Sequence, residues 1–133
     1  MSEADSLIGR KVLVTGAGGF IGSHLTEALA GGGADVTAMV RYNSGSLIGN
    51  LAFLERRIRD GIKIISGNIE DSDFMVHAMK DQEIVFHLAA LIAIPYSYVA
   101  PRSYLRTNVE GTLNVLEAAR RFGTTRLVHT STS

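Results

Sequence analysis

The sequence has no cysteine, carries no net charge, and contains no apolar run long enough to cross a membrane. The lack of cysteine excludes disulfides and thiol chemistry and leaves the redox compartment open. Because 13 basic residues balance 13 acidic ones and no basic stripe stands out, nucleic-acid binding has no electrostatic support. Residues 1–10 contain Glu3 and Asp5 and lack an apolar segment, unlike a secretory signal. We therefore expect a soluble, cytoplasmic protein that binds neither membranes nor nucleic acid.

Histidine could still supply metal ligands, but its pattern does not favour a metal site. The spacings between the four histidines do not repeat, and no cysteine accompanies them. We therefore predict no metal site and interpret these side chains as structural. They are His24, His77, His87 and His129.

The 133 residues suffice for one domain with its own core, and strand-like segments alternate with helix-like segments throughout. This alternation predicts right-handed crossovers and a parallel sheet covered by helices on both faces. We expect an α/β, Rossmann-like doubly wound domain over 1–133, with its strands in the order 3-2-1-4-5 and its ligand between the first and fourth strands. The expected strands are 11–15, 35–40, 62–66, 83–87 and 126–130.

The helices are expected between these strands, with glycines ending three of them. Segment 91–101 is expected to be a long irregular loop, because Pro95 and Pro101 bracket it. The apolar spacing of the last helix predicts a buried face made of Leu105, Val109, Leu113 and Leu116. The helices are expected from Ile21 to the glycines at 31–33, over 47–60, from Asp71 or Ser72 to Met79, and from Pro101 to Phe122.

The stretch 11–22, KVLVTGAGGFIG, passes from a short aliphatic strand through a glycine turn into an amphipathic helix. Its glycines at Gly16, Gly19 and Gly22 follow the spacing G-x-x-G-x-x-G. A diphosphate needs backbone N–H groups at a helix N-terminus and close approach, which a Cβ on Gly16 or Gly19 would obstruct. A Cβ on Gly22 would push the helix off the strand. The stretch therefore predicts a dinucleotide site; the alternative is a glycine-rich loop with no ligand.

The end of the second expected strand bears on nucleotide choice. An acidic residue there would accept hydrogen bonds from an adenosine ribose, but the sequence has Val40 followed by Arg41. A guanidinium is well matched to a 2′-phosphate. We therefore predict NADP or NAD as cofactor, with NADP favoured. The alternative is that Arg41 stacks on adenine or points to solvent.

The ends of the later strands carry further candidate contacts. The amide of Asn68 could exchange hydrogen bonds with an adenine edge while Ile69 packs on its face; the alternative is an ordinary turn asparagine. Leu88-Ala89-Ala90 leaves the fourth strand opposite the glycine loop, where small residues would let the backbone approach the nicotinamide ribose. The hydroxyls of Thr130–Ser133 could hydrogen-bond a substrate oxygen; the alternative is a polar strand end.

Taken together, these residues resemble the extended short-chain dehydrogenase/reductase family, in particular its nucleotide-sugar epimerases and dehydratases. The matching segments follow the family's order and spacing over nearly the whole chain. The stretches IPYSYVAP, VRYNS and STS look most similar to sugar-nucleotide 4,6-dehydratases. The matching segments are VTGAGGFIG (14–22), GNIED (67–71), HLAA (87–90), TNVEGTLNVLEAA (107–119) and VHTSTS (128–133).

The resemblance implies an enzyme that oxidises a nucleotide-diphosphate sugar at C4 by hydride transfer to NAD or NADP. Water elimination across C5–C6 or rotation and reduction of the ketone would follow, and the full-length relative would be a homodimer. The resemblance also implies roles for single residues. Gly16, Gly19 and Gly22 match the phosphate loop, Phe20 and Ile21 match its backbone donors, and Arg41 matches the arginine of NADP users. Asn108 and Thr130 match positions beside the cofactor, and Asn68 stands where the family more often has aspartate. Ser97 and Tyr98 match the sugar-contacting loop, and Thr132 matches the catalytic residue that hydrogen-bonds the 4-oxygen.

The family's catalytic Tyr-x-x-x-Lys pair does not occur in this sequence. We therefore interpret the chain as the amino-terminal part of a longer enzyme, inactive alone, whose fifth strand is an open edge that promotes self-association. The alternatives are a non-catalytic dinucleotide-binding module or redox sensor, and a truncated product without function. Tyr42, Tyr96, Tyr98 and Tyr104 are followed at the required spacing by Ser46, Ala100, Arg102 and Asn108.

Overall fold

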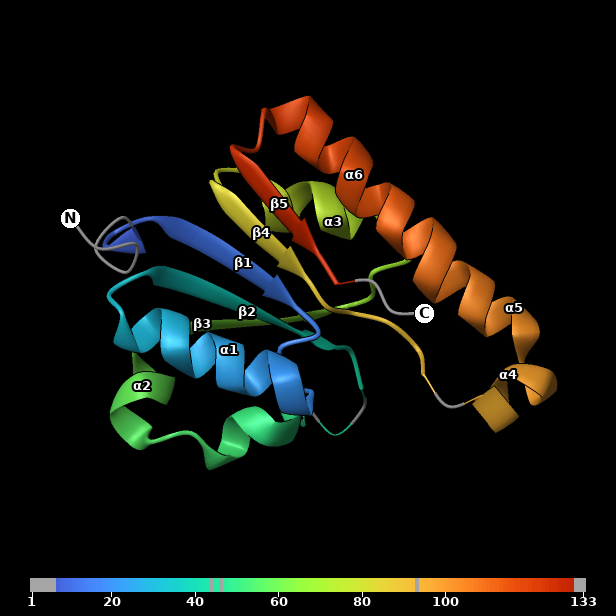
Figure 1. Ribbon diagram of the computed structural model, residues 1–133, viewed down its shortest axis with the longest axis horizontal. Coiled ribbons are helices and arrows are strands. Elements are labelled where there is room, and N and C mark those ends of the chain that lie inside the picture. Colours follow the sequence, from blue (N-terminus) through green and yellow to red (C-terminus); the bar gives the residue numbers. More distant parts are fainter. Residues whose placement is uncertain (1–6, 44, 46, 93, 131–133) are drawn as a thin grey trace.

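The computed structural model describes residues 7–43, 45, 47–92 and 94–130. All strands of the sheet are parallel, and the sheet has five strands in the order β3-β2-β1-β4-β5, which confirms the expected topology (Figure 1). The order reverses between β1 and β4, where the carboxyl ends of the strands point to the same edge. The strands are β1 (Lys11–Thr15), β2 (Asp35–Arg41), β3 (Lys63–Gly67), β4 (Ile84–His87) and β5 (Arg126–His129).

Helices cover both faces of the sheet, as the alternation predicts. Helices α1 and α2 lie on one face, and α3 and α6 lie on the other (Figure 1). No helix within the described residues is long and apolar enough to span a bilayer. The helical elements are α1 (Phe20–Gly31), η2 (Gly49–Phe53), α2 (Arg56–Asp60), α3 (Ser72–Met79), α4 (Ile94–Val99), α5 (Pro101–Tyr104), the π-helical segment η3 (Leu105–Glu110) and α6 (Gly111–Phe122).

Alternate residues of β1 supply two separate cores. Val12 and Val14 are fully buried on the α1 face together with Leu51, whereas Leu13 is buried on the other face with Val115 of α6. Each such aliphatic side chain contributes about 1.5–3 kcal/mol by leaving water. Because β1 is buried on both faces, it reads as an unbroken aliphatic run, and its position at the centre of the sheet follows from that burial.

The expected helix over 47–60 is wrong in its middle. A 3₁₀ turn, η2, is followed by extended backbone at Leu54, with ψ at 148°, before α2 begins. The Leu54 backbone N–H donates to the Leu51 carbonyl at 3.2 Å, and both side chains still reach the core. A 3₁₀ turn brings residues three apart onto one side, so it satisfies the same apolar spacing as an α-helix.

The expected loop over 91–101 is also wrong, because it contains the short helix α4. The long helix does begin at Pro101 and end before Gly123, which takes the left-handed φ of 63° expected of a C-cap glycine. Its hydrogen-bonding pattern changes along its length, from α5 through the π-helical η3 to α6.

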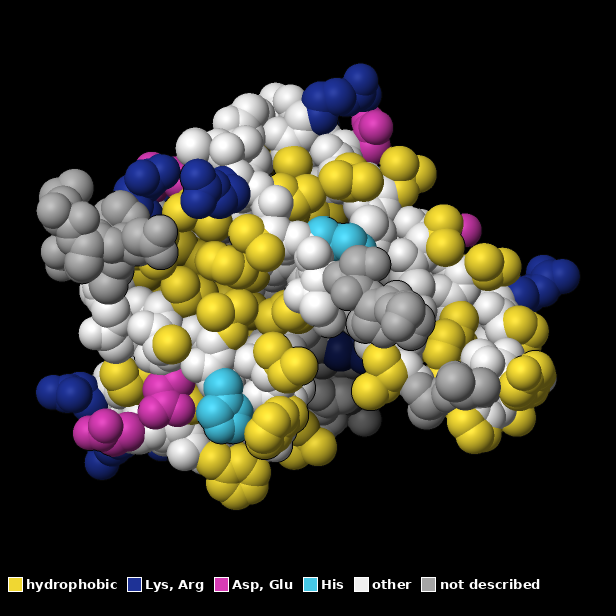
Figure 2. Space-filling view, viewed as in Figure 1, with side chains coloured by type: hydrophobic (Ala, Val, Ile, Leu, Met, Phe, Trp, Pro, Cys, Tyr) yellow, Lys and Arg dark blue, Asp and Glu magenta, His cyan; other side chains and the backbone are white. Residues whose placement is uncertain are grey.

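The predicted buried face of the long helix is wrong. Leu105, Val109, Leu113 and Leu116, here named the leucine stripe, are between 49% and 58% exposed. The helix instead packs through small or β-branched residues, which allow it to approach the sheet and α3 closely. Figure 2 accordingly shows hydrophobic side chains gathered on the surface over the long helix and α4. The residues facing inward are Thr107, Gly111, Val115 and Ala118.

Candidate dinucleotide site

The glycine loop lies where β1 meets the start of α1. Gly16 takes a left-handed φ of 69°, and a Cβ there would sit 2.8 Å from the Ala89 backbone nitrogen. A Cβ on Gly22 would collide with the backbone of Gly16, so α1 and β1 touch through glycine. Gly19 is the N-cap of α1 and has no side chain to cap the first N–H groups of the helix. N–H groups at the start of a helix favour an anion, and this end of α1 lies beside the cavity at the carboxyl edge of the sheet.

Gly19 has room for a Cβ among the protein atoms, so its expected role in the approach of a diphosphate stays a prediction. A Cβ on Gly19 would make only an ordinary contact, 3.5 Å from the Gly16 carbonyl oxygen. Gly18, which lies outside the glycine spacing, is the tighter position, because its Cβ would lie 3.3 Å from the Ile48 carbonyl oxygen. Within the protein, the close approaches of this loop therefore depend on Gly16, Gly18 and Gly22.

A cavity of about 530 Å³ opens beside this loop. Its wall combines the start of α1, the ends of β2 and β3, and the backbone that follows β4. The structure therefore brings together, around one cavity, all but one of the predicted cofactor residues, Asn108 being the exception. Those on the wall are Gly16, Gly19, Phe20, Ile21, Gly22, Arg41, Asn68, Ile69, Leu88, Ala89, Ala90 and Thr130.

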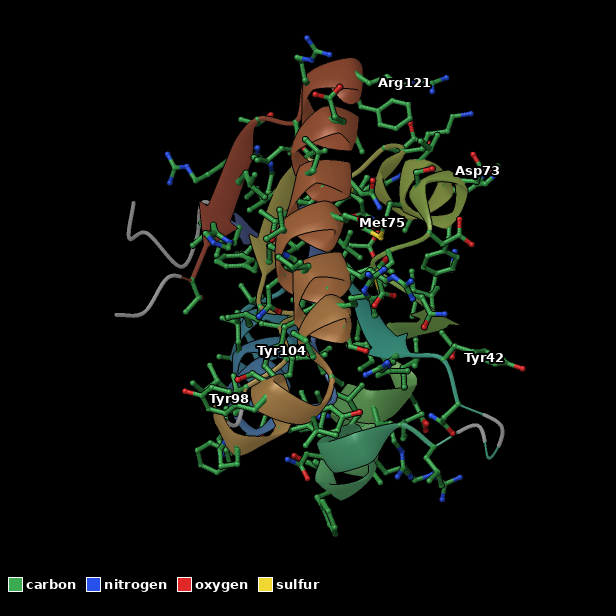
Figure 3. The ribbon with its side chains drawn as sticks, turned by 90° about the vertical axis from the view of Figure 1, so that its right-hand side faces the viewer. Tyr42, Asp73, Met75, Tyr98, Tyr104 and Arg121 are labelled. Carbon is green, nitrogen blue, oxygen red and sulfur yellow. The ribbon has the colours of Figure 1, made fainter. Side chains whose placement is uncertain are left out.

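Arg41 ends β2 at the mouth of this cavity with an exposed side chain. None of the ion pairs among the described residues involves it. The following loop is held by Asn43, whose amide donates to the carbonyls of Arg41 and Leu47 and whose Oδ1 accepts from the Leu47 N–H at 2.8 Å. Figure 3 shows the intervening Tyr42 pointing away from the molecule, so Arg41 is the side chain of this turn that reaches the cavity.

The loop after β3 is fixed from the long helix. Ile69 is only 5% exposed and packs on Gly111, where a Cβ would lie 2.6 Å from the Ile69 side chain. The Asn114 amide donates to the Ile69 carbonyl at 3.0 Å, and the Thr107 hydroxyl donates to the Glu70 carboxylate at 2.7 Å. Asn68 is exposed at the cavity wall. The loop therefore presents the polar side chain of Asn68 on backbone that packs on the long helix and hydrogen-bonds to it.

Asn108 acts behind the wall. Its Oδ1 accepts from the Leu91 N–H at 2.8 Å, and its Nδ2 donates to the Leu91 carbonyl at 3.0 Å. Asn108 thereby fixes the backbone that carries Leu88-Ala89-Ala90 out of β4. Ser97 and Tyr98 lie on α4, away from the cavity lining, and Tyr98 is 83% exposed (Figure 3).

The end of β5 is described only in part. Thr130 lines the cavity, and its N–H reaches the His87 carbonyl at 3.4 Å. The predicted catalytic residue Thr132 lies outside the described residues. Within the described range, no three His, Asp or Glu side chains gather in a way that could hold a metal ion.

Residues 13–133 match the family model described as GDP-mannose 4,6 dehydratase. The chain belongs to this family. A curated relative, UDP-N-acetyl-alpha-D-glucosaminuronate decarboxylase of Bacillus cytotoxicus, is 32% identical over 124 residues, which are 93% of this chain and 37% of that protein. The match confirms the resemblance to nucleotide-sugar enzymes.

Solved structures agree with this assignment. A UDP-N-acetylglucosamine 4-epimerase from Methanobrevibacter ruminantium, in complex with UDP-N-acetylmuramic acid, has a TM-score of 0.81 at 31% identity and covers 95% of this chain. MoeE5 in complex with UDP-glucose and NAD has a TM-score of 0.74 at 36% identity and covers 92% of this chain. The chain spans 39% and 36% of these two proteins, so it is well under half the length of either.

In this member of the GDP-mannose 4,6 dehydratase family, sequence reasoning missed the polar groups behind the cavity. Thr15 and His87, at the ends of β1 and β4, are buried and hydrogen-bonded to each other at 2.8 Å. Burial lowers the pKa of His87 to about 4, with a smaller contribution from the nearby His129. The one signal in the sequence was a histidine closing an otherwise apolar strand, where a polar side chain needs a buried partner.

Proposed function

We propose that this chain is the NAD(P)-binding part of an enzyme that oxidises a nucleotide-diphosphate sugar at C4. The observation that carries the proposal is the glycine cradle. The Gly16 turn brings bare backbone and the N-terminus of α1 to a cavity of about 530 Å³ at the point where the strand order reverses. A diphosphate fits such a cradle because N–H groups and the helix dipole both favour its charge.

Different residues on the cavity wall would contact different parts of the cofactor. The N–H groups of Phe20 and Ile21 would hold the diphosphate, and Asn68 would meet the adenine edge. Ala89 and Ala90 line the wall, and the Ala89 backbone lies against Gly16 of the glycine loop. When bound, the nicotinamide accepts a hydride from the sugar. Because Arg41 replaces the usual carboxylate at the end of β2, we propose that NADP binds more tightly than NAD.

For the reaction itself we propose 4,6-dehydration. The description of the matching family supports it, as do the stretches IPYSYVAP and STS. Thr132 would orient the sugar's 4-oxygen, and Ser97 and Tyr98 would contact the sugar. The relatives include proteins named for decarboxylation and epimerisation as well as a dTDP-glucose 4,6-dehydratase, so decarboxylation and epimerisation are the outcomes against which dehydration has to be tested.

A second candidate function is a dinucleotide-binding module without turnover, such as a redox sensor. Such a module would need the glycine cradle beside the cavity and no catalytic base. Both candidates share the cofactor site, and they differ in whether sugar-nucleotide product forms.

We also propose that the protein forms a homodimer through the leucine stripe. The stripe places four large apolar side chains on one exposed face of one helix. Its flanks carry both charge signs, with Arg106 and Glu110 on neighbouring turns. Two copies related by a two-fold axis would bury the same face on each and pair these opposite charges, which is the usual form of a dimer interface.

The cofactor site is tested by titration calorimetry of the chain with NAD and NADP. Gly16→Ala would force the left-handed turn to carry a Cβ against the Ala89 backbone, so we expect dinucleotide affinity to fall at least about tenfold. Gly31→Ala is the matched control, because a Cβ there meets nothing within 4 Å. Equal affinities in the two variants would refute a phosphate role for the loop.

The reaction is tested on the protein at its full cellular length, with UDP-, GDP-, CDP- and dTDP-hexoses. Mass spectrometry separates the outcomes, because dehydration removes one water from the substrate whereas epimerisation leaves its mass unchanged. A 4-keto product lighter by one water supports dehydration. An isobaric product, or loss of carbon dioxide from a uronic-acid substrate, contradicts it.

A further inference from the structure

Behind the cavity wall, a chain of buried hydrogen bonds crosses three elements. The Thr15 hydroxyl meets His87 Nδ1 at 2.8 Å, and His87 Nε2 meets the Thr112 hydroxyl at 3.0 Å. Thr15 is fully buried and His87 is 2% exposed. These hydrogen bonds therefore join the end of β1, the end of β4 and the long helix, with the Thr15–His87 pair buried and Thr112 half-buried.

The partners at each end fix the direction of every bond. The Thr112 hydroxyl donates to the Asn108 carbonyl at 2.7 Å, so toward His87 it can only accept, and Nε2 must carry the proton. The Thr15 oxygen accepts the backbone N–H groups of Leu88 and Ala89 at 3.0 and 3.1 Å, so it gives its own proton to Nδ1. A neutral ring with its proton on Nε2 satisfies every group in the chain.

These bonds hold the part of the wall that touches the glycine loop. Thr15 directly precedes Gly16, and the Ala89 backbone that it binds is the group against which a Gly16 side chain would collide. At the far end, Thr112 binds the carbonyl of Asn108, whose side chain fixes Leu91. The loop, the backbone after β4 and the helix thus have one common attachment at His87.

We propose that His87 is a positioning residue that sets the distance between the glycine loop and the backbone following β4, and thereby the fit of the dinucleotide. The inference rests on the proposed cofactor site. His87 itself reaches no ligand, because it acts through the Thr15 hydroxyl.

Protonation of His87 would break this arrangement. A second N–H at Nδ1 would need the Thr15 oxygen to accept a third hydrogen bond, and its two lone pairs already receive Leu88 and Ala89. Among the described residues, His129 on β5 is the titratable group that acts on His87, with its ring stacked 5.3 Å away. A positive charge there also disfavours protonation of His87, in keeping with its low pKa.

The test compares two threonine-to-valine variants of the chain by dinucleotide calorimetry. Thr15→Val removes the hydroxyl that links His87 to the Ala89 backbone. Thr37→Val is the control, since this buried β2 hydroxyl accepts from the Gln82 amide at 3.2 Å and lies outside the cavity lining. We expect Thr15→Val to weaken dinucleotide binding about tenfold, because the Ala89 N–H loses its hydroxyl acceptor and the Leu88 N–H keeps only the Thr15 carbonyl, at 3.3 Å. Thr37→Val should bind as the parent does.

A second pair of variants, at Thr112, distinguishes a loss of binding from a loss of folding. Thr112→Val removes the far end of the chain, and Thr112→Ser keeps its hydroxyl. Affinity should fall about fivefold in the valine variant and return in the serine variant, while both show cooperative melting. Imidazole ¹⁵N shifts in the parent should report a neutral His87 with its proton on Nε2 at pH 7.

The outcomes distinguish a failure of the His87 positioning role from a failure of the proposed cofactor site. A parent chain that binds neither NAD nor NADP refutes the proposed cofactor site. A parent that binds, with equal affinities in Thr15→Val and Thr37→Val, refutes the positioning role alone. A His87 proton found on Nδ1, or a valine variant of Thr112 that binds like its serine variant, refutes it as well.

Discussion

At the scale of single residues, Arg41 determines the predicted choice between the two dinucleotides. Its guanidinium stands exposed at the cavity mouth, outside every ion pair of the described residues. One charge-assisted hydrogen bond contributes about 1.5–3 kcal/mol, so Arg41→Ala should reduce the preference for NADP over NAD about tenfold or more. Titration calorimetry with both dinucleotides measures the ratio. Arg57→Ala on α2 is the control and should leave it unchanged; equal affinities for NAD and NADP in the parent would contradict the prediction.

His87 predicts a pH dependence of stability. Its pKa is about 4 in the folded protein, against an ordinary value of 6.5. Between these values the unfolded chain binds more protons, so the free energy of unfolding should rise with pH from about 4 to 6.5, by up to about 3 kcal/mol. Urea denaturation between pH 5 and 7 measures this slope. His87→Asn should flatten it, whereas replacement of the exposed His77 by Gln should not; a slope unchanged in His87→Asn would show that other groups cause it.

At the scale of elements, the contact between the long helix and the loop after β3 depends on a glycine. Gly111→Ala would bring a Cβ within 2.6 Å of the Ile69 side chain, so it should destabilise the protein by about 1–3 kcal/mol although alanine is the better helix former. Gly31→Ala, with nothing within 4 Å, should be neutral or stabilising. Chemical denaturation of the two variants measures the difference, and an equal effect in both would refute the contact as the cause.

The inward face of the long helix could not be predicted from the sequence, whereas the strand order could. Alternating elements determine the strand order, and strand ends share an edge, so the residues around the cavity were predictable. The inward face was not, because periodicity follows large apolar side chains, whereas this helix buries Gly111 and Ala118. The hydrogen bond of His87 could not be predicted for another reason. Its partner Thr15 lies 72 residues away, and only the pairing of β1 with β4 brings them together.

At the scale of the whole molecule, the leucine stripe predicts self-association. Leu113→Lys would place a charge in the middle of the stripe and should shift a dimer to monomer, because a buried unpaired charge is unfavourable. Phe53→Lys is the control, since Phe53 is 86% exposed at the end of η2, on the other face of the sheet. Sedimentation velocity distinguishes the states. A parent that is monomeric at high concentration would contradict the proposed interface.

The 133-residue chain is expected to bind dinucleotide without turning over sugar nucleotide. Deprotonating a sugar hydroxyl near neutral pH needs a base whose pKa is close to the working pH, and no Tyr-x-x-x-Lys pair occurs in the 133 residues. Losing such a base removes about 10²–10⁴ of the rate. Mass spectrometry after incubation with NAD or NADP and hexose nucleotides is the measurement. Turnover that disappears in Thr132→Val would place the catalytic groups within this chain.

The position of β1 in the sheet also determines the order in which its two edges are paired during synthesis. It is the first strand in the sequence and the middle strand of the sheet, with β2 on one side and β4 on the other. During synthesis, β1 can pair with β2 at once, but its second edge stays open until more than 70 further residues have emerged. An unpaired aliphatic edge of this kind is a target for aggregation. The late arrival of β4 thus pairs the second edge of β1 and brings the backbone after β4 against the glycine loop, before β5 pairs with β4.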